Sequence, residues 1–452
     1  MPSLKIVNAP FHTVPELLNM IDGGALDTTF TALFAAGGAP AARARAHALV
    51  ETFAVRYGKD RPVALFTVAG RSELSGNHTD HNHGAVIAAS VSMDMLGVAA
   101  RRADNLVRIY SEGFGEDVVD LAVDTIPDES RFGTSRALVA GVAAGFRRDG
   151  LSVGGLDACL TSDILKGSGL SSSAAFEDMV GLLQSHLYNE GAVDEVTISK
   201  IAQYAENVFF GKPCGLMDQV ACAVGGIVAI DFADPSAPVI ERLPFDMAAA
   251  GYHLCIVNTG GNHADLTDDY AAVPAEMKVV ATYFGKAVLR DVEESIVLDA
   301  IPALRESCGD RAILRALHFF AENRRVDLQK AALSAAIAAT DEATRDAALS
   351  AYFGGVLESG RSSYCYLQNV YTTQNVAEQG LSLALCLCEQ VLRDVAGHHG
   401  AYRVHGGGFA GTVQAYVPED RVAAFTATMD AAFGQGATSD LRIRPVGAAR
   451  IA

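Results

Sequence analysis

The sequence predicts a fold of mixed α and β structure, and three observations support that fold class. The chain has 452 residues, half of them hydrophobic, which is enough for two or three domains with buried cores. Its 43 glycines lie between segments whose apolar residues alternate as in strands or recur as in helices. Only 19% of the residues are charged, which argues against a coiled coil or a disordered chain. We therefore expect an α/β or α+β fold.

The charge balance and the cysteines limit the partners and the compartment. The formal net charge is −18, so we expect no nucleic-acid partner, and a phosphate compound must be held by local positive charge. The cysteines include no Cys-x-x-Cys pair, which is typical of reduced thiols in a cytoplasmic protein. There is no signal-peptide pattern, and Asp94 interrupts the longest apolar run, at 85–100, so no membrane span is expected. We expect a cytoplasmic monomer or homodimer.

The first element along the chain is helical. Residues 41–57 place a stripe of apolar side chains at helical spacing, made of Ala46, Leu49, Val50, Phe53 and Tyr57. We expect residues 1–60 to form a helical extension that packs on the first domain.

Residues 61–235 alternate between strand and helix patterns and form the predicted first domain. The expected strands are 63–68, 85–93, 98–110, 155–163 and 226–232. The expected helices are 136–146, 176–187 and 198–209. The last helix stops at Gly211 and Pro213, which are sound terminators. A polar stretch at 70–84 is expected to be a turn between the first two strands.

The sequence Ala-Asp-Pro-Ser-Ala-Pro at 233–238 is the best boundary signal in the chain. Residues 236–452 form the predicted second domain. It has an expected strand at 253–258, helical patterns up to residue 395, and a strand pair at 402–404 and 413–417. Between the paired strands lies a second glycine cluster, Gly-Gly-Gly-Phe-Ala-Gly at 406–411.

A glycine loop at 167–175 reads Gly-Ser-Gly-Leu-Ser-Ser-Ser-Ala-Ala and precedes a helical pattern. Glycine lets the backbone approach a ligand, and the free amides and dipole of a helix start attract an anion. The loop lacks the Gly-Lys-Ser/Thr of a Walker A sequence and the full Gly-x-Gly-x-x-Gly of dinucleotide folds. It therefore predicts either a phosphate site or an ordinary turn with a helix cap.

The polar stretch at 70–84 is rich in histidine and acidic residues. His78, His81, His83 and Asp80 carry side chains that can ligate zinc or iron. Three interpretations stay open, namely a solvated turn, a metal site and polar recognition of a ligand. A metal-dependent hydrolase that uses these four residues is one hypothesis.

A third segment, Cys-Gly-Leu-Met-Asp-Gln at 214–219, places Asp218 in apolar surroundings. A buried carboxylate must be hydrogen-bonded or charge-paired, and such a group can serve as a base. The alternative is a helix cap. Glu206, at the edge of an apolar helical stripe, is by default a solvated residue.

Together these segments resemble the superfamily of galactokinase, homoserine kinase, mevalonate kinase and phosphomevalonate kinase, and within it the galactokinases. The stretch at 70–82 is similar to the galactokinase signature Gly-Arg-Val-Asn-Leu-Ile-Gly-Glu-His-Thr-Asp-Tyr-Asn. The glycine loop matches Gly-x-Gly-Leu-Ser-Ser-Ser-Ala, and 214–219 resembles Cys-Gly-Ile-Met-Asp-Gln. Residues 406–411 resemble the C-terminal glycine motif, and all four segments occur in the family's order.

The resemblance implies a two-domain α+β fold with the active site between the domains, and an ATP- and Mg²⁺-dependent kinase for the C1 hydroxyl of a hexose, most simply galactose. It makes Asp218 the general base and Arg71 the group that offsets charge during phosphoryl transfer. Ser173 and Glu206 are the implied magnesium ligands. The implied ATP-binding residues are Gly167, Ser168, Gly169, Leu170, Ser171, Ser172, Ser173 and Ser111. The implied sugar-binding residues are Asn77, His78, Asp80, Gly215 and Tyr270.

The chain departs from the galactokinase signature at several positions. Asn77 stands where galactokinases usually have Glu, and Ser72, Glu73, Ser75 and His81 also differ. An amide donates as well as accepts, so the substituent at the far end of the sugar, and with it the sugar's identity, is open. A kinase for galacturonate, N-acetylgalactosamine or arabinose is an alternative, as is a catalytically silent regulator that binds sugar and ATP.

Overall fold

Two β-sheets organise the protein, which is described by a computed structural model over residues 10–164, 169–212, 214–261, 266–393, 400–409 and 411–452. The larger sheet contains β1 (His12–Thr13), β2 (Pro62–Ser75), β3 (Ala85–Arg101), β4 (Leu106–Ser111), β5 (Gly115–Asp120), β6 (Leu156–Ser162), β7 (Ile227–Asp231), β8 (Val239–Leu243) and β13 (Ala449–Arg450). The smaller sheet contains β9 (Tyr252–Asn258), β10 (Ala401–Val404), β11 (Thr412–Pro418) and β12 (Thr438–Leu441).

The long strands β2 and β3 are the spine of the larger sheet. They pair antiparallel with each other, and β3 also pairs with β7 through its first residues and with β6 through its last. Strand β4 runs parallel to β6, so the larger sheet is mixed. The smaller sheet has the order β10-β11-β9-β12 and is antiparallel.

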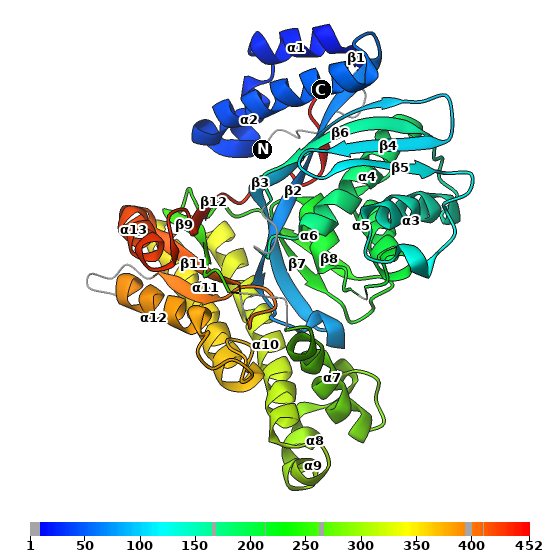
Figure 1. Ribbon diagram of the computed structural model, residues 1–452. Helices are drawn as coiled ribbons and strands as arrows, with labels where there is room; N and C mark the ends of the chain where they lie inside the picture. Colours follow the sequence, from blue (N-terminus) through cyan, green and yellow to red (C-terminus); the bar gives the residue numbers. More distant parts are fainter. Residues whose placement is uncertain (1–9, 165–168, 213, 262–265, 394–399, 410) are drawn as a thin grey trace.

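Helices cover both faces of the larger sheet (Figure 1). Alternate residues of β2 point to opposite faces, since Ala64, Phe66 and Val68 belong to one core and Val63 and Leu65 to another. The first core includes the helices α3 (Ser135–Arg148), α4 (Ser172–Tyr188) and α5 (Glu195–Tyr204). The second core includes α1 (Val14–Asp22) and α2 (Asp27–Tyr57), which buries the stripe expected at 41–57.

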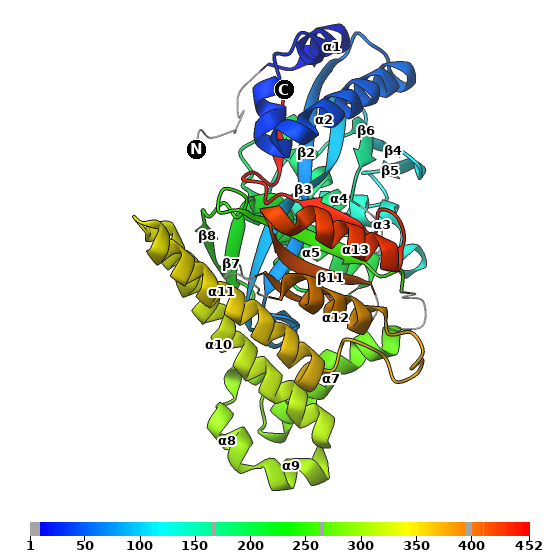
Figure 2. The same cartoon turned by 90° about the vertical axis from the view of Figure 1, so that its left-hand side faces the viewer.

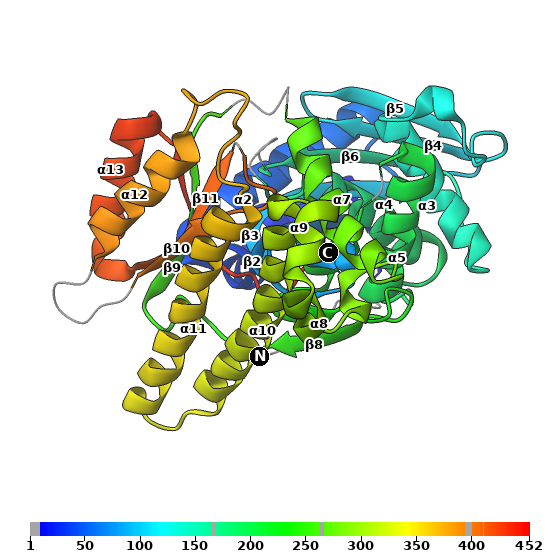
Figure 3. The ribbon, with the colours of Figure 1, turned by 90° about the horizontal axis from the view of Figure 1, so that it is seen from below.

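The smaller sheet carries its own helices. They are α11 (Glu342–Ser362), α12 (Gly380–Leu392) and α13 (Val422–Phe433), and Figure 3 shows α12 and α13 on the side of the molecule away from α3 to α5. Four more helices lie between β9 and α11 in the chain, namely α7 (Thr267–Tyr283), α8 (Glu294–Asp299), α9 (Ile301–Ser307) and α10 (Asp310–Ala338). Figures 1 and 2 both place α8 and α9 at the end opposite α1. No helix in the described part of the chain has the length and apolar character needed to cross a membrane.

The chain returns to the larger sheet after building the smaller one. Strand β13 pairs with β2, with Ala449 opposite Thr67. Backbone hydrogen bonds also join Leu65 to Ile451 and Ala452. The stretch predicted as a boundary, 233–238, forms the turn between β7 and β8, which pair with each other.

Most predicted elements in the first half are confirmed, but one predicted turn and the division of residues 85–110 into strands are wrong. The stretch at 70–84, expected as a turn, begins as a strand because β2 continues to Ser75. The strands expected at 85–93 and 98–110 are one strand, β3, followed by β4. The misleading residue is Asp94, which is buried within β3 and pairs with Arg444 at 3.1 Å and Arg45 at 3.0 Å.

We expect Asp94→Asn to lower the free energy of unfolding by about 3 kcal/mol or more, because it leaves the buried guanidinium of Arg444 without its charged partner. Urea or thermal unfolding measures the loss. Asp163→Asn is the matched control, since Asp163 also pairs with Arg45 but its side chain is 48% exposed. That change should cost less than about 1 kcal/mol. Equal losses in the two variants would contradict the role given to the buried pair.

Candidate active site

Arg71 and Asp218 form a bidentate ion pair at the centre of the site. Arg71 lies in β2, and Asp218 lies in the first turn of α6 (Met217–Val224). Arg71 Nε donates to Oδ1 of Asp218 at 2.8 Å, and Nη2 donates to Oδ2 at 2.7 Å. Its remaining nitrogen, Nη1, donates to the backbone carbonyl of Gly169. One guanidinium therefore joins β2, α6 and the glycine loop.

The Asp218 carboxylate is ionised and keeps an open acceptor position. Burial favours the neutral acid, but the charge and hydrogen bonds of Arg71, with help from Ser171 and Lys212, hold the pKa of Asp218 below its ordinary value. Oδ2 accepts from both Arg71 and Ser171, whereas Oδ1 accepts from Arg71 alone among the described residues. A carboxylate oxygen has two acceptor sites, so Oδ1 can still accept from a bound hydroxyl. The side chain is 34% exposed, which leaves it accessible.

The described part of the glycine loop runs from Gly169 into α4. The carbonyl of Leu170 accepts from the backbone amide of Arg71 at 3.1 Å, which fixes the loop against β2. Ser171 has a left-handed backbone with φ 57°, and α4 starts at the next residue. The start of a helix presents backbone amides without intrahelical partners, which is the geometry of an anion site.

Of the other residues predicted to bind the nucleotide or the metal, two follow this loop directly and one ends a strand of the larger sheet. Ser172 and Ser173 form the first turn of α4, and both are partly exposed. Ser111 ends β4, opposite Leu160 of β6, the strand that leads toward the loop. The predicted residues Gly167 and Ser168 lie outside the described residues.

Two buried carboxylates, one on α4 and one on the π-helical turn Ala205–Phe210, share a single amide. Gln219 Nε2 donates to Glu177 at 3.2 Å and to Glu206 at 2.9 Å. Glu206 also pairs with Lys212 at 3.1 Å, so the sequence-based expectation that it is solvated is wrong. Burial and the charge of Glu206 raise the pKa of Glu177 well above its ordinary value. Oε1 of Glu177 has no hydrogen-bond partner among the described residues, so this oxygen-rich site fits a hard cation such as Mg²⁺.

Successive carbonyls of the second glycine cluster hold three of the predicted sugar-binding residues. The pairs are Asn77 Nδ2 to Gly406 O at 2.7 Å, His78 Nε2 to Gly407 O at 3.0 Å, and the Tyr270 hydroxyl to Gly408 O at 2.8 Å. A carbonyl can only accept, so Nε2 of His78 carries the proton. Burial lowers the pKa of His78 to about 4, which keeps the ring neutral near pH 7.

Asp80 and Gly215 are also brought together. Asp80 opens the short turn Asp80–Asn82, and Gly215 precedes α6. A Cβ atom added to Gly215 would lie 2.4 Å from Oδ2 of Asp80. The absence of a side chain at 215 therefore lets the carboxylate approach the backbone. Of the other histidines in the stretch, His81 has Nε2 4.0 Å from Asp80 Oδ1.

The hydrolase hypothesis required a metal-binding cluster in this stretch. Across the described ranges, no group of three or more histidine, cysteine or acidic side chains is arranged to hold a metal ion. His78 instead uses Nε2 for the carbonyl of Gly407. The four residues of that hypothesis are therefore not assembled as ligands.

Asn77 has no exposed surface, and its amide is saturated by protein groups. Nδ2 donates to Glu73 Oε1 at 3.2 Å as well as to the Gly406 carbonyl. Oδ1 accepts from Ser363 Oγ at 3.2 Å and from Asn369 Nδ2 at 2.9 Å. A side-chain amide offers two donor hydrogens and two acceptor lone pairs, so all four positions are occupied. This residue, predicted to bind sugar, has no free hydrogen-bonding position.

The sequence alone does not predict the partners that several polar residues of β2 find elsewhere in the chain. Ser72 Oγ lies 3.0 Å from His405 Nε2, and Gln414 Nε2 donates to Ser72 Oγ at 2.7 Å. Arg403 pairs with Glu73. One signal was available, because Ser72 and Ser75 replace the apolar Val and Ile of the signature within a strand. Polar side chains at such positions need buried partners.

The chain has relatives among known proteins. The family model described as GHMP kinases N terminal domain matches residues 137–226, and the Galactokinase galactose-binding signature matches residues 51–101. A galactokinase of Streptomyces coelicolor is 33% identical over 283 residues, which cover 61% of this chain and 70% of the relative. A galactokinase of Actinobacillus pleuropneumoniae is 28% identical over 374 residues, which cover 82% of this chain and 89% of the relative.

Solved structures share the fold. A structure of Lactococcus lactis galactokinase complexed with galactose matches with a TM-score of 0.71 at 24% identity, covering 88% of this chain and 98% of that one. The mevalonate kinase of Methanococcus jannaschii matches with a TM-score of 0.56 at 11% identity, covering 84% and 98%. These matches confirm the predicted α+β kinase fold.

We expect Gly408→Ala to destabilise the protein by about 2–4 kcal/mol, because it combines overpacking with left-handed backbone strain. Gly408 has φ 82°, and an added Cβ would lie 1.9 Å from the backbone oxygen of Asn369. Gly406→Ala is the matched control, since Gly406 also has positive φ, 63°, but its added Cβ meets no atom of the described residues within 4 Å. The control should cost about 1 kcal/mol in urea unfolding. A loss at Gly408 no larger than at Gly406 would contradict the assigned packing.

Proposed function

Because the chain belongs to the galactokinase family, we propose that it transfers the γ-phosphoryl group of ATP to the C1 hydroxyl of galactose. The observation that carries this proposal is the Arg71–Asp218 pair, which is tied to the glycine loop through the carbonyl of Gly169. It sets an ionised base beside the loop that the resemblance assigns to ATP. Phosphoryl transfer asks mainly for such alignment and for stabilisation of charge.

Asp218 is the general base. Its lowered pKa keeps it ionised at neutral pH, and Oδ1 is the oxygen with a free acceptor site. As the C1 oxygen of the sugar bonds to the γ-phosphorus, its proton passes to Asp218 and the bond from the γ-phosphorus to its bridging oxygen breaks, releasing ADP. Arg71 keeps the carboxylate aligned and offsets negative charge on the transferring group.

The glycine loop at 167–173 binds the triphosphate, with Ser111 close to the nucleotide. The start of α4 supplies backbone amides and the positive end of the helix dipole. Ser173 and Glu206 would hold a magnesium ion, and the oxygen of Glu177 that has no partner among the described residues supports a cation at this place. Such an ion would supply positive charge that offsets the charge of the phosphate oxygens. The enzyme works in the cytoplasm, in keeping with its cysteine usage.

His78, Asp80, Gly215 and Tyr270 surround the sugar. Asp80 suits a pair of ring hydroxyls, since an ionised carboxylate accepts from two donors. The close approach of Asp80 to Gly215 supports a shared role for these two residues. Asn77 is the remaining residue of the predicted set, and its saturated amide acts by holding its neighbours rather than by direct contact.

The purified protein should convert galactose and ATP to galactose 1-phosphate and ADP, as measured by a coupled ADP assay and ³¹P NMR. Asp218→Asn should lower turnover by roughly 100-fold or more with a smaller change in ATP binding, because the amide keeps the size of the side chain and can accept from Arg71 but cannot take the proton. Galacturonate, N-acetylgalactosamine and arabinose are assayed in parallel. Turnover of one of them without galactose would replace the proposed substrate, and binding without turnover of any sugar would favour the silent regulator.

The pH dependence of kcat/KM should depend on Arg71. The pKa of Asp218 is lowered in the folded protein, so the base stays ionised down to acidic pH. Burial raises the pKa of Asp218, and the charge of Arg71 is the main effect that lowers it. Arg71→Met removes that charge, so the acid limb of the profile should move up by about 1–3 pH units. Ser171→Ala should move it less, since Ser171 contributes one hydrogen bond. An unchanged acid limb in the Arg71 variant would contradict the assignment of Asp218 as the base.

A further inference from the structure

Relative to the galactokinase signature, the chain has exchanged two residues that touch each other. The signature has Asn at the place of Glu73 and Glu at the place of Asn77. In the folded chain Asn77 Nδ2 donates to Glu73 Oε1 at 3.2 Å. The pair therefore keeps one amide and one carboxylate, but the carboxylate is at 73 instead of 77 and the amide is at 77 instead of 73.

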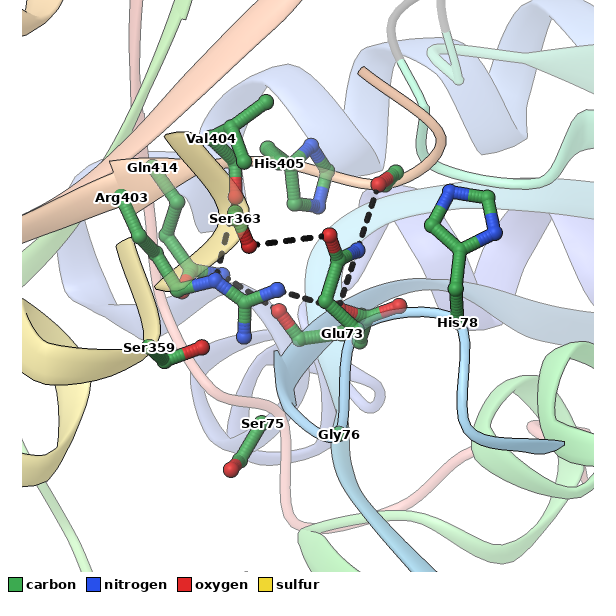
Figure 4. Close-up of polar contacts among 12 residues, drawn as sticks. Glu73, Ser75, Gly76, His78, Ser359, Ser363, Arg403, Val404, His405 and Gln414 are labelled. Carbon is green, nitrogen blue, oxygen red and sulfur yellow. Dashed lines mark hydrogen bonds and ion pairs between the residues drawn. The ribbon is translucent and has the colours of Figure 1, made fainter. Parts of the chain in front are cut away.

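The exchanged carboxylate is matched by a buried arginine from the smaller sheet. Arg403, which lies in β10 and has no exposed surface, pairs with Glu73 and also donates through Nε to the carbonyl of Val404 (Figure 4). A second buried carboxylate, Glu322 of α10, pairs with Arg325 at 2.6 Å. Glu322 accepts from the backbone amides of Gly76 and Asn77 at 3.2 and 3.3 Å.

The cluster around these groups is balanced in charge. Among the described residues it contains the carboxylates Glu73 and Glu322 and the guanidiniums Arg403 and Arg325, and Arg71 and Asp80 add one charge of each sign near Glu73. Burial raises the pKa of Glu73, and the charge of Arg403 opposes this effect. The neighbouring His78, His318 and His405 have pKa values lowered by burial, so they are neutral near pH 7. A carboxylate added at 77 without a change at 73 would leave one buried charge uncompensated.

We propose that Glu73 and Asn77 are a coupled pair of positioning residues that hold the sugar-binding segment against the smaller sheet. Asn77 fixes its segment to Gly406 and to the turn at Ser363, and its backbone carbonyl accepts from Nε2 of His318 at 3.0 Å. Glu73, near the end of β2 and just before this segment, pairs with Arg403 of β10. The pair thereby sets the place of His78 and Asp80, which follow directly in the chain. Only the KM measurements of this inference rest on the proposed function, whereas the Tm measurements do not.

Three variants test the coupling, namely Asn77→Glu, Glu73→Asn and the double exchange. Asn77→Glu should lower Tm by about 5 °C or more and raise the KM for galactose at least about 10-fold, with the KM for ATP changed less than about twofold. Glu73→Asn should also lower Tm, since it leaves Arg403 unpaired. The double exchange restores the charge balance and should recover most of the Tm and the galactose KM of the natural chain.

Two further variants separate charge from size and from position. Asn77→Asp adds the charge without the extra methylene, and it should be rescued by Glu73→Gln in the same way. Gln329→Glu is the matched control. Gln329 is a buried amide whose Oε1 accepts from Ser75, which lies in β2 together with Glu73. Among the described residues, Gln329 makes no hydrogen bond to Glu73. Glu73→Asn should not rescue Gln329→Glu.

The proposal would be overturned if the decrease in Tm of the double exchange equalled the sum of the decreases in the two single variants. It would also be overturned if the galactose KM stayed unchanged in Asn77→Glu. A galactose KM and an ATP KM that rise together would assign the pair a general structural role and would also overturn it. If the natural chain turned over no sugar, the proposed function would fall. The Tm cycle would still decide whether the two residues are coupled.

Discussion

The bidentate contact between Arg71 and Asp218 is the interaction on which the rest of the site depends. Two charges taken largely out of water are tolerated only if each is paired and hydrogen-bonded. Arg71 meets this requirement by using Nε and both terminal nitrogens, and its third bond reaches the carbonyl of Gly169. The same contact that keeps the carboxylate ionised therefore also sets the distance between α6 and the glycine loop.

The second organising feature is the glycine cluster between β10 and β11. Its carbonyls at 406, 407 and 408 receive donors from the polar stretch after β2 and from α7. These donors come from segments far apart in the sequence, so the cluster acts as a common template for them. Glycine is required where it is packed most closely, because Gly408 lies against the backbone of Asn369.

Local patterns predicted the elements that depend on local physics. The apolar stripe after the glycine loop predicted α4, and the terminator at Gly211 marked the end of the turn after α5. The sequence could not predict the length of β2 or the continuity of β3, because the polar residues that interrupt their patterns are satisfied by distant partners. Asp94 depends on Arg444, and Ser72 depends on His405. Motif order predicted which segments form the site, whereas the saturation of Asn77 required the folded chain.

The pairing of β13 with β2 has a consequence for how the protein is made. The bonds from Leu65 to Ile451 and Ala452 cannot form until almost 390 residues after Leu65 have been synthesised. During translation, the edge of β2 that β13 later covers is thus an unpaired strand edge, the kind of surface that invites aggregation. The larger sheet is therefore completed only after the smaller sheet has been synthesised, and a nascent chain stalled before residue 449 keeps this edge of β2 exposed.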